Sequence, residues 1–398
     1  MVRIGSASSA LSSLSAPSPP VRGSLRDPGT TSPQSGEGAT RLSDIRAWMA
    51  RQDVDAAYLT RPVSVAYLTG FRSEPHERLM ALAVRPDGAT LIVPALEHEN
   101  AVRQSAQVEV VSWRDGEDPY TLVPEALANP RRGRLGVEKD HLSVQAAEAL
   151  GARAGARGLV DVAPEVRRLR RTKSAAEVEN LARAAAITDE VTAEVMGRLA
   201  SSASELEVAM WLSAAITARG ATLSFESSVQ SGANSAVPHH RPSARKPVAG
   251  DLILLDFGAA FEGYNADITR MAVVGAPNPR QLEIHALVLR AHDAAIAAVR
   301  AGTTAGAVDG AAREVIVAAG LGDRFFHRVG HGLGLEVHED PSLDPGSTMV
   351  LEPGMVMTIE PGIYIPGWGG VRIEDDVVVE SNGCRVLTTA DRALVMVH

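Results

Sequence analysis

Hydrophobic and polar positions divide the chain into a stretch with little to bury and two stretches with regular patterns. Up to about Thr40 the sequence is rich in Ser, Pro and Gly, which predicts a disordered tail over residues 1–40. From Arg41, RLSDIRAWMARQDVDAAYLT has the spacing of an amphipathic helix followed by a short strand. The apolar runs AAYLT, RLMALAV and ATLIVP, with the helical pattern of HLSVQAAEALGARAG, predict a small α/β domain over residues 41–162 without an obvious catalytic cluster.

The pattern changes to long helices and paired strands over residues 163–398. Ser174 with Glu177, and Ser204 with Glu207, have the spacing of capping boxes, which predict that a helix begins after each serine. Two strand-like segments follow, DLILLDFGA and ADITRMAVV. Asn278-Pro279 then suits the start of a further helix. A fourth helical segment, AGAVDGAAREVIVAAG, precedes two more strands at GMVMTIEPGIY and VRIEDDVVVE.

This order of elements repeats at the level of single residues. Asp256 has a glycine six positions before it and another two positions after it, and so does Glu360. A glycine also lies four positions before Asp267 and four positions before Glu374. Glu360 follows Asp256 by 104 residues and Glu374 follows Asp267 by 107. The repeat predicts an α+β domain built from a duplicated helix–helix–hairpin unit, with an acid at both strand positions of each copy.

Composition narrows the class of protein. The 398 residues are 45% apolar and 22% charged, as in ordinary globular proteins, and no apolar run is long enough to span a membrane. The net charge of −9 argues against nucleic acid or an anionic membrane surface as the main partner. The single cysteine, Cys384, cannot form an internal disulfide or a thiolate metal site. We therefore expect a cytoplasmic protein in which oxygen atoms and imidazoles hold any metal.

The four repeated acids are the strongest chemical signal. In each predicted hairpin they are nearly equidistant from the expected turn, at Phe261-Glu262 and at Gly367, so each pair should lie opposite across the ladder, roughly 5 Å apart at Cβ. Carboxylates that end buried strands repel one another and lose hydration unless protons or cations compensate them. With His331, from the glycine-rich FFHRVGHGLGLEVHEDP, they predict a site for two divalent ions. H-E-x-x-H, G-x-S-x-G and Walker-type motifs are absent from the sequence.

The stretches LDFGAAFEGYNADITR, HRVGHGLGLEVHE, TIEPGIY and VRIEDD resemble the pita-bread metallopeptidases, the M24 group of methionine aminopeptidase, aminopeptidase P and prolidase. The resemblance covers about residues 167–397. AYLTGF resembles the creatinase-like N-terminal domain of aminopeptidase P and prolidase, which typical methionine aminopeptidases lack. It implies a pita-bread catalytic domain over 163–398, behind a creatinase-like domain over 41–162.

The resemblance also implies roles for individual residues. The implied metal ligands are Asp256, Asp267, His331, Glu360 and Glu374, with Asp267 and Glu374 bridging two ions. Among the implied catalytic residues, His239 contacts substrate near the scissile bond, His338 stabilises the tetrahedral intermediate and His327 lines the proline-side pocket. Arg372 and Tyr364 match positions that support the ligands from behind, and Glu360 is expected to serve also as the general base.

The implied activity is hydrolysis of the Xaa-Pro bond at the N-terminus of dipeptides or short peptides by a metal-bridging hydroxide. Mn²⁺ is the expected metal, and Co²⁺, Fe²⁺ and Zn²⁺ are the alternatives. A proline-containing peptide is the expected partner, and a homodimer is implied by the family. The sequence leaves open dipeptidase against aminopeptidase. The alternative functions are those of a methionine aminopeptidase-like enzyme, of a hydrolase of non-peptide amides, and of a metal-free binding or chaperone module.

Overall fold

The computed structural model describes residues 33–128, 133–200, 202–238 and 240–398. The chain forms two compact units that meet between Ala163 and Pro164, one residue beyond the expected boundary. Helix α6, Ala163–Arg171, begins at this boundary. Within the described residues, no helix is both long enough and apolar enough to cross a lipid bilayer.

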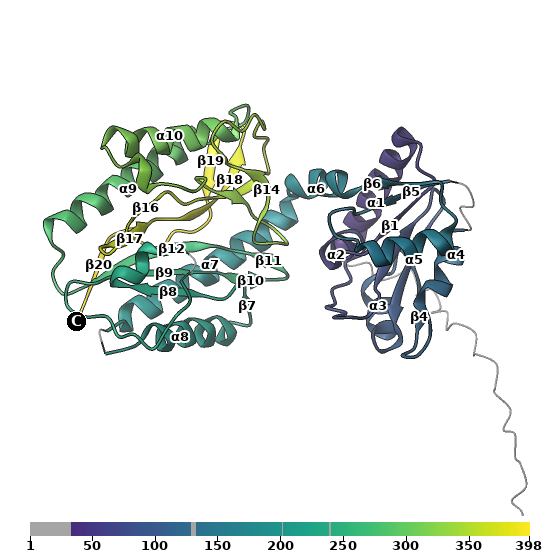
Figure 1. Ribbon diagram of the computed structural model, residues 1–398, viewed down its shortest axis with the longest axis horizontal. Helices are drawn as coiled ribbons and strands as arrows, with labels where there is room; N and C mark the ends of the chain where they lie inside the picture. The colour runs from purple at the N-terminus through teal and green to yellow at the C-terminus, as the bar shows by residue number, and fades with distance from the viewer. Residues whose placement is uncertain (1–32, 129–132, 201, 239) are drawn as a thin grey trace, which may run out of the picture. The chain divides into compact units, whose positions relative to one another are not determined.

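The first unit is built on a six-stranded sheet in the order β4-β3-β2-β1-β5-β6, in which only β2 runs antiparallel to the others. Its strands are β1 Ala56–Leu59, β2 Ala81–Val84, β3 Ala89–Pro94, β4 Glu109–Trp113, β5 Arg134–Val137 and β6 Gly158–Asp161. Its helices are α1 Pro33–Gln52, α2 Pro62–Thr69, α3 His98–Gln104, α4 Val123–Ala126 and α5 Val144–Ala154 (Figure 1). Short 3₁₀ helices cover Ala95–Glu97 and Pro119–Leu122.

Helix α1 begins at Pro33, within the stretch expected to be a disordered tail over residues 1–40. Proline fits the first turn of a helix because the amide hydrogen that it lacks would have no partner there. Further along α1, Leu42, Ile45 and Met49 are buried, and this apolar stripe anchors the helix. Residues 1–32 of the expected tail lie outside the described residues.

The second unit repeats a pair of helices followed by antiparallel strands. Its helices are α7 Ala175–Arg198, α8 Glu205–Ala218, α9 Pro279–Ala298 and α10 Ala305–Ala318, and short 3₁₀ helices cover Gly232–Ala236 and Gly322–Arg324. The strands of the first half are β7 Thr222–Leu223, β8 Ser228–Ser231, β9 Leu252–Phe257, β10 Ala259–Phe261, β11 Tyr264–Asn265 and β12 Ile268–Val274. The remaining strands are β13 His331–Gly332, β14 Glu339–Ser342, β15 Val356–Ile359, β16 Gly362–Ile365, β17 Gly369–Arg372, β18 Asp375–Glu380, β19 Gly383–Val386 and β20 Val395–Val397. The predicted capping boxes at Ser174 and Ser204 are confirmed, and so is the helix start at Asn278, which also forms a capping box with Gln281.

The strands of this unit lie between its two helix pairs. Figure 1 shows α9 and α10 on one side and α7 and α8 on the other. Along β9, Leu252 and Leu254 pack in the cluster of α9 and α10, whereas Ile253 and Leu255 pack in the cluster of α7 and α8. Because alternate residues of a strand face opposite sides, burial on both sides explains the continuous apolar run LILL.

The register of the two acid-bearing hairpins differs from the expectation in one of two cases. Thr358 pairs with Asp376 and Ile359 with Asp375, and this register continues to put Glu360 opposite Glu374, as predicted. In the first hairpin Asp256 pairs with Thr269, so the prediction that it lies opposite Asp267 is wrong by two residues.

The cause is the turn of the first hairpin. Glu262 and Gly263 both have positive φ, 48° and 72°, and Phe261 pairs with Tyr264 around them, which is the two-residue hairpin geometry that suits a twisted ladder. The turn is therefore centred one residue later than Phe261-Glu262. Asp256 and Asp267 still share a face of the sheet, because Asp267 lies two residues from Thr269.

A buried carboxylate at the start of α8 ties this helix to the segment after β8. Glu205 accepts hydrogen bonds from the amide and hydroxyl of Ser231, from Asn234, and from the amide and hydroxyl of Ser243, and it lies 3.0 Å from His240 Nε2. Burial alone would raise the pKa of Glu205, but these hydrogen bonds lower it to about 2.

The lowered pKa makes the stability of this unit depend on pH. The pKa of Glu205 is lower in the folded chain than in the unfolded chain, so its stabilisation is present above about pH 4.3 and is lost as the pH falls towards 2. We expect Glu205→Gln to lower the free energy of unfolding at pH 7, and the gap to wild type to shrink by about 2 kcal/mol at pH 3. Urea titrations of both proteins measure this gap. A gap that stays constant between pH 7 and pH 3 contradicts the prediction.

Candidate metal centre

Acids and a histidine from both halves of the second unit meet in one buried cluster. Asp267, His331 and Glu374 each offer a ligand atom within 4.8 Å of the others, and all three residues are buried. His331 Nε2 lies 3.3 Å from Glu360 Oε1 and 3.9 Å from Asp267 Oδ2. Asp256 joins the cluster through Arg372, whose guanidinium contacts both the Asp256 and the Glu374 carboxylates. The five residues expected as ligands are thus brought together.

Two glycines let the backbone approach closely beside the predicted ligands. A Cβ on Gly258, two residues after Asp256, would lie 1.7 Å from the carbonyl oxygen of Ala266. A Cβ on Gly330, next to His331, would lie 1.9 Å from the carbonyl oxygen of Thr358. Neither distance is possible for a real Cβ atom, so only glycine allows these segments to pack as they do.

The carboxylates have more negative charge than their surroundings compensate. Burial, and then the charges of Glu374 and Asp256, raise the pKa of Asp267 well above its ordinary value. Burial, and then the charges of Glu360 and Asp256, do the same for the pKa of Glu374. Asp267 Oδ1 is buried with no hydrogen-bond partner in the described part of the chain. Bare acceptor atoms that face one another in this way fit a cation, which neutralises the charge and occupies the orphaned oxygen.

The imidazole of His331 is oriented to serve as a ligand. Its Nδ1 lies 3.1 Å from the carbonyl oxygen of Gly332, so this nitrogen carries the proton that it donates there. Burial lowers the pKa of His331 to about 3, with a smaller contribution from His338. The neutral ring therefore turns the lone pair of Nε2 towards the carboxylates, which is the orientation that a metal requires.

Arg372, Tyr364 and His327 form a hydrogen-bonded row beside the acids. Arg372 Nη1 donates to the Tyr364 hydroxyl over 2.8 Å, and that hydroxyl lies 3.1 Å from His327 Nε2. His327 Nδ1 lies 2.7 Å from the Arg328 carbonyl, so Nδ1 donates and Nε2 accepts from tyrosine. Burial raises the pKa of Tyr364 to about 12 and lowers that of His327 to about 4. Both groups are therefore neutral at pH 7.

The other two predicted histidines are His338 and His239. His338 is exposed, and its ring meets that of His331 edge to face with the centroids 4.2 Å apart. It lines a cavity of about 220 Å³ together with Arg167, Arg328 and Ser342. His239 lies outside the described residues.

Two threonines that the sequence motifs did not indicate also belong to the site. The Thr269 hydroxyl donates to Glu374 over 2.5 Å and accepts from Arg372 Nε over 2.9 Å. The Thr358 hydroxyl accepts from the His331 amide and donates to Glu360. Each threonine lies two residues from a predicted ligand on a strand and so shares its face. That spacing is the signal in the sequence that could have found them.

Comparisons with known proteins agree with this geometry. Residues 179–381 match the model of metallopeptidase family M24, and residues 41–172 match that of the creatinase/prolidase N-terminal domain. An uncharacterized peptidase of Staphylococcus aureus is 37% identical over 351 residues, which are 88% of this chain and 99% of that protein.

Solved structures give the same result. An Xaa-Pro dipeptidase from Bacillus anthracis is 33% identical with a TM-score of 0.85, over 90% of this chain and 99% of that one. A dipeptidase from Mycobacterium ulcerans is 38% identical with a TM-score of 0.83, over 91% of this chain and 98% of that one. These matches confirm the resemblance and the expected fold: the chain belongs to metallopeptidase family M24 and carries a creatinase/prolidase-type N-terminal domain in front of its pita-bread catalytic domain.

Proposed function

We propose that this peptidase is dinuclear and hydrolyses the Xaa-Pro bond at the N-terminus of dipeptides or short peptides. The observation that carries the proposal is the buried cluster of carboxylates with unbalanced charge around His331. Support for proline specificity comes from similar proteins named as Xaa-Pro dipeptidase and prolidase. The N-terminal domain match argues against a methionine aminopeptidase-like enzyme.

Asp256, Asp267, His331, Glu360 and Glu374 would hold the two ions, with Mn²⁺ as the expected metal. When bound, the ions would acidify a water molecule and polarise the scissile carbonyl. The chain's own groups handle the protons. Glu360 Oε1 is held by the Thr358 hydroxyl over 3.2 Å, and Oε2 remains to take a proton from the attacking water and pass it to the proline nitrogen.

The histidines would act on the substrate, whereas Arg372 and Tyr364 would position the metal ligands. His338, at the exposed edge of the His331 ring, would donate a hydrogen bond to the developing oxyanion, with His239 as the alternative donor. Arg372 contacts the Asp256 and Glu374 carboxylates and would hold them in place, Tyr364 orients Arg372 through its hydroxyl, and His327 would border the proline side. The protein is further proposed to be a homodimer located in the cytoplasm.

The cavity beside His338 adds a preference on the proline side. Arg328 donates to the Ser342 hydroxyl over 2.6 Å, and no carboxylate among the described residues forms an ion pair with it. Burial is the largest cause of the lowered pKa values of His327 and His331, and the charge of Arg328 contributes to both. A half-buried guanidinium this close to the site suits a substrate with a free carboxylate after the scissile bond, as in a dipeptide.

Removing a ligand tests the metal centre. We expect Glu374→Ala to lower the Gly-Pro cleavage rate by more than about a thousandfold and to reduce the metal content below two ions per chain. Elemental analysis and a kinetic assay after Mn²⁺ addition measure both. Glu352→Ala, at an exposed acid, is the matched control and should change neither quantity. Near-normal cleavage by metal-loaded Glu374→Ala would overturn the scheme.

His338 makes a different prediction because it is expected to touch the substrate and not the ions. His338→Ala should lower kcat by about a hundredfold while the metal content stays at two ions per chain. Steady-state kinetics and elemental analysis of one preparation separate the two effects. Loss of metal in this variant would show that its role is ligation.

Substitution of Arg328 tests whether the enzyme prefers a dipeptide to a longer peptide. We expect wild type to cleave Gly-Pro with a higher kcat/KM than Gly-Pro-amide, Gly-Pro-Gly or Met-Ala. Arg328→Gln should raise KM for Gly-Pro by about tenfold and leave KM for Gly-Pro-amide nearly unchanged. Kinetics with this peptide panel measure both effects. An equal change for Gly-Pro and its amide rules out carboxylate recognition by Arg328, and faster cleavage of Met-Ala rules out proline specificity.

A further inference from the structure

Residues 325–329 carry two side chains that the proposed reaction needs, His327 and Arg328, yet they belong to no helix or strand. The backbone groups of such a segment have no regular ladder to pair with, and those that are buried must find other partners. Phe325 and Val329 are 1% and 0% exposed, so both ends of the segment lie in the core. Groups outside the segment must therefore hold its backbone in place.

Two side chains of helix α10 supply these partners. Arg313 donates from Nη1 to the Phe325 carbonyl oxygen and from Nη2 to the His327 carbonyl oxygen, both over 2.8 Å. Asp309, one turn earlier on the helix, accepts from the Val329 amide over 3.0 Å. Backbone groups at three alternate positions thus bind one acid and one guanidinium, which take the place of a neighbouring strand in a sheet.

The pair is itself held firmly. Arg313 Nε and Nη2 donate to the two carboxylate oxygens of Asp309 over 2.7 and 2.9 Å. Asp309 is fully buried, and the guanidinium compensates the charge that burial makes costly. The guanidinium also lies over the Phe325 ring, 4.2 Å from its centroid. A planar group that is bound at its edges and on one face has little freedom to move, so the pair is a rigid attachment point.

This attachment lies on both sides of Arg328. The His327 carbonyl belongs to the peptide group before Arg328, and the Val329 amide belongs to the peptide group after it. Because each peptide group is planar, the pair fixes both planes that meet at the Cα atom of Arg328. The direction in which the Arg328 side chain leaves the backbone is thereby set, and its guanidinium then donates to the Ser342 hydroxyl over 2.6 Å.

We propose that Asp309 and Arg313 are positioning residues, which hold the peptide groups around Arg328 so that its guanidinium meets the carboxylate of the substrate. This inference rests on the proposed function, in which Arg328 recognises a free carboxylate after the scissile bond. Neither member of the pair lines the cavity beside His338, so both act through the segment. An acid and an arginine four residues apart on a helix would otherwise indicate an ordinary ion pair.

The kinetic test uses the metal-loaded full chain. Arg313→Gln should raise KM for Gly-Pro by about tenfold and KM for Gly-Pro-amide by less than about threefold, with the metal content unchanged. In an Arg328→Gln background the same substitution should add less than about twofold, because both residues act on one contact. An equal rise for both peptides, or effects that multiply in the double variant, overturns the proposal.

Two further variants separate position from charge. Arg313→Lys keeps the charge but cannot bind both carbonyls and Asp309 together, so it should restore less than half of the lost affinity for Gly-Pro. Arg198→Gln is the matched control, because Arg198 lies 3.7 Å from the acid Glu194 four residues earlier and 4.2 Å from the Trp211 centroid. It should change neither KM by more than about twofold. Full rescue by lysine, or an equal effect of the control, overturns the proposal.

Hydrogen exchange separates this inference from the proposed function, because it does not depend on catalysis. Peptides that cover residues 325–331 should exchange at least about tenfold faster in Asp309→Asn and Arg313→Gln than in wild type or Arg198→Gln. The Arg313 side chain is 24% exposed, so its variant serves if Asp309→Asn does not fold. Unchanged exchange overturns the inference. Faster exchange supports it even where Arg328→Gln leaves KM for Gly-Pro unchanged, a result that would refute carboxylate recognition alone.

Discussion

The catalytic unit depends on keeping several carboxylates together out of water. Carboxylates are costly to bury, and each additional one raises the cost for the others. Arg372 supplies one positive charge to Asp256 and Glu374, and hydroxyl groups of Thr269 and Thr358 supply hydrogen bonds. The remaining imbalance appears as raised pKa values and as the orphaned oxygen of Asp267. Bound metal ions would compensate this excess of negative charge, and the fold brings the acids together where they could bind such ions.

Much of this arrangement could be predicted from the sequence because both copies of the repeat show the same pattern. Asp256 and Glu360 end apolar runs in both copies, and the spacing of glycines around them repeats. A buried strand that ends in an acid is unusual enough to carry meaning by itself. The capping boxes at Ser174 and Ser204 were equally readable, since a serine and a glutamate three residues apart satisfy each other's backbone groups.

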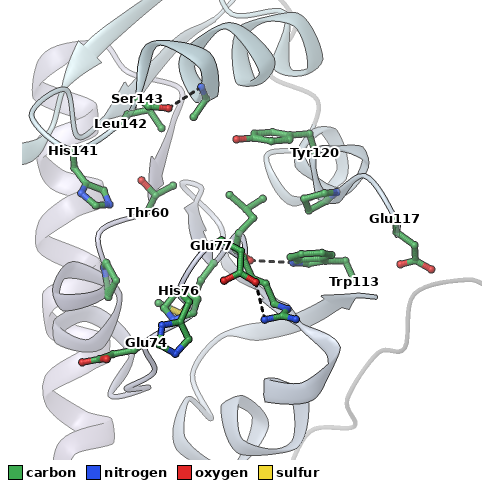
Figure 2. A pocket seen from close by; sticks show the side chains of 17 residues that line it. Thr60, Glu74, His76, Glu77, Trp113, Glu117, Tyr120, His141, Leu142 and Ser143 are labelled. Carbon is green, nitrogen blue, oxygen red and sulfur yellow. Dashed lines mark hydrogen bonds and ion pairs between the residues drawn. The ribbon is translucent and has the colours of Figure 1, made fainter. Parts of the chain in front are cut away.

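What could not be predicted depends on contacts that leave no local pattern. Thr269 and Thr358 look like ordinary strand residues until the strands are assembled and their hydroxyls meet the acids. The register of the first hairpin depends on Glu262 adopting positive φ, which is uncommon for a residue with a side chain. A cavity of about 820 Å³ in the first unit (Figure 2) lies where separate strands end, so no local pattern in the sequence predicts it.

The meeting of Thr269 with Glu374 has a consequence for the integrity of the unit. These residues come from different copies of the duplicated unit, and an isolated bridge and a side-chain hydrogen bond join them. Behind them, Arg270 of the first copy pairs with Asp375 of the second, both fully buried. The cluster of proposed metal ligands thus also lies at the seam between the copies. Ions that bind both sides of a seam favour its closed form by mass action. If the proposed ions bind here, their removal should loosen the join between the copies, and hydrogen exchange along β12 and β18 would report this loosening.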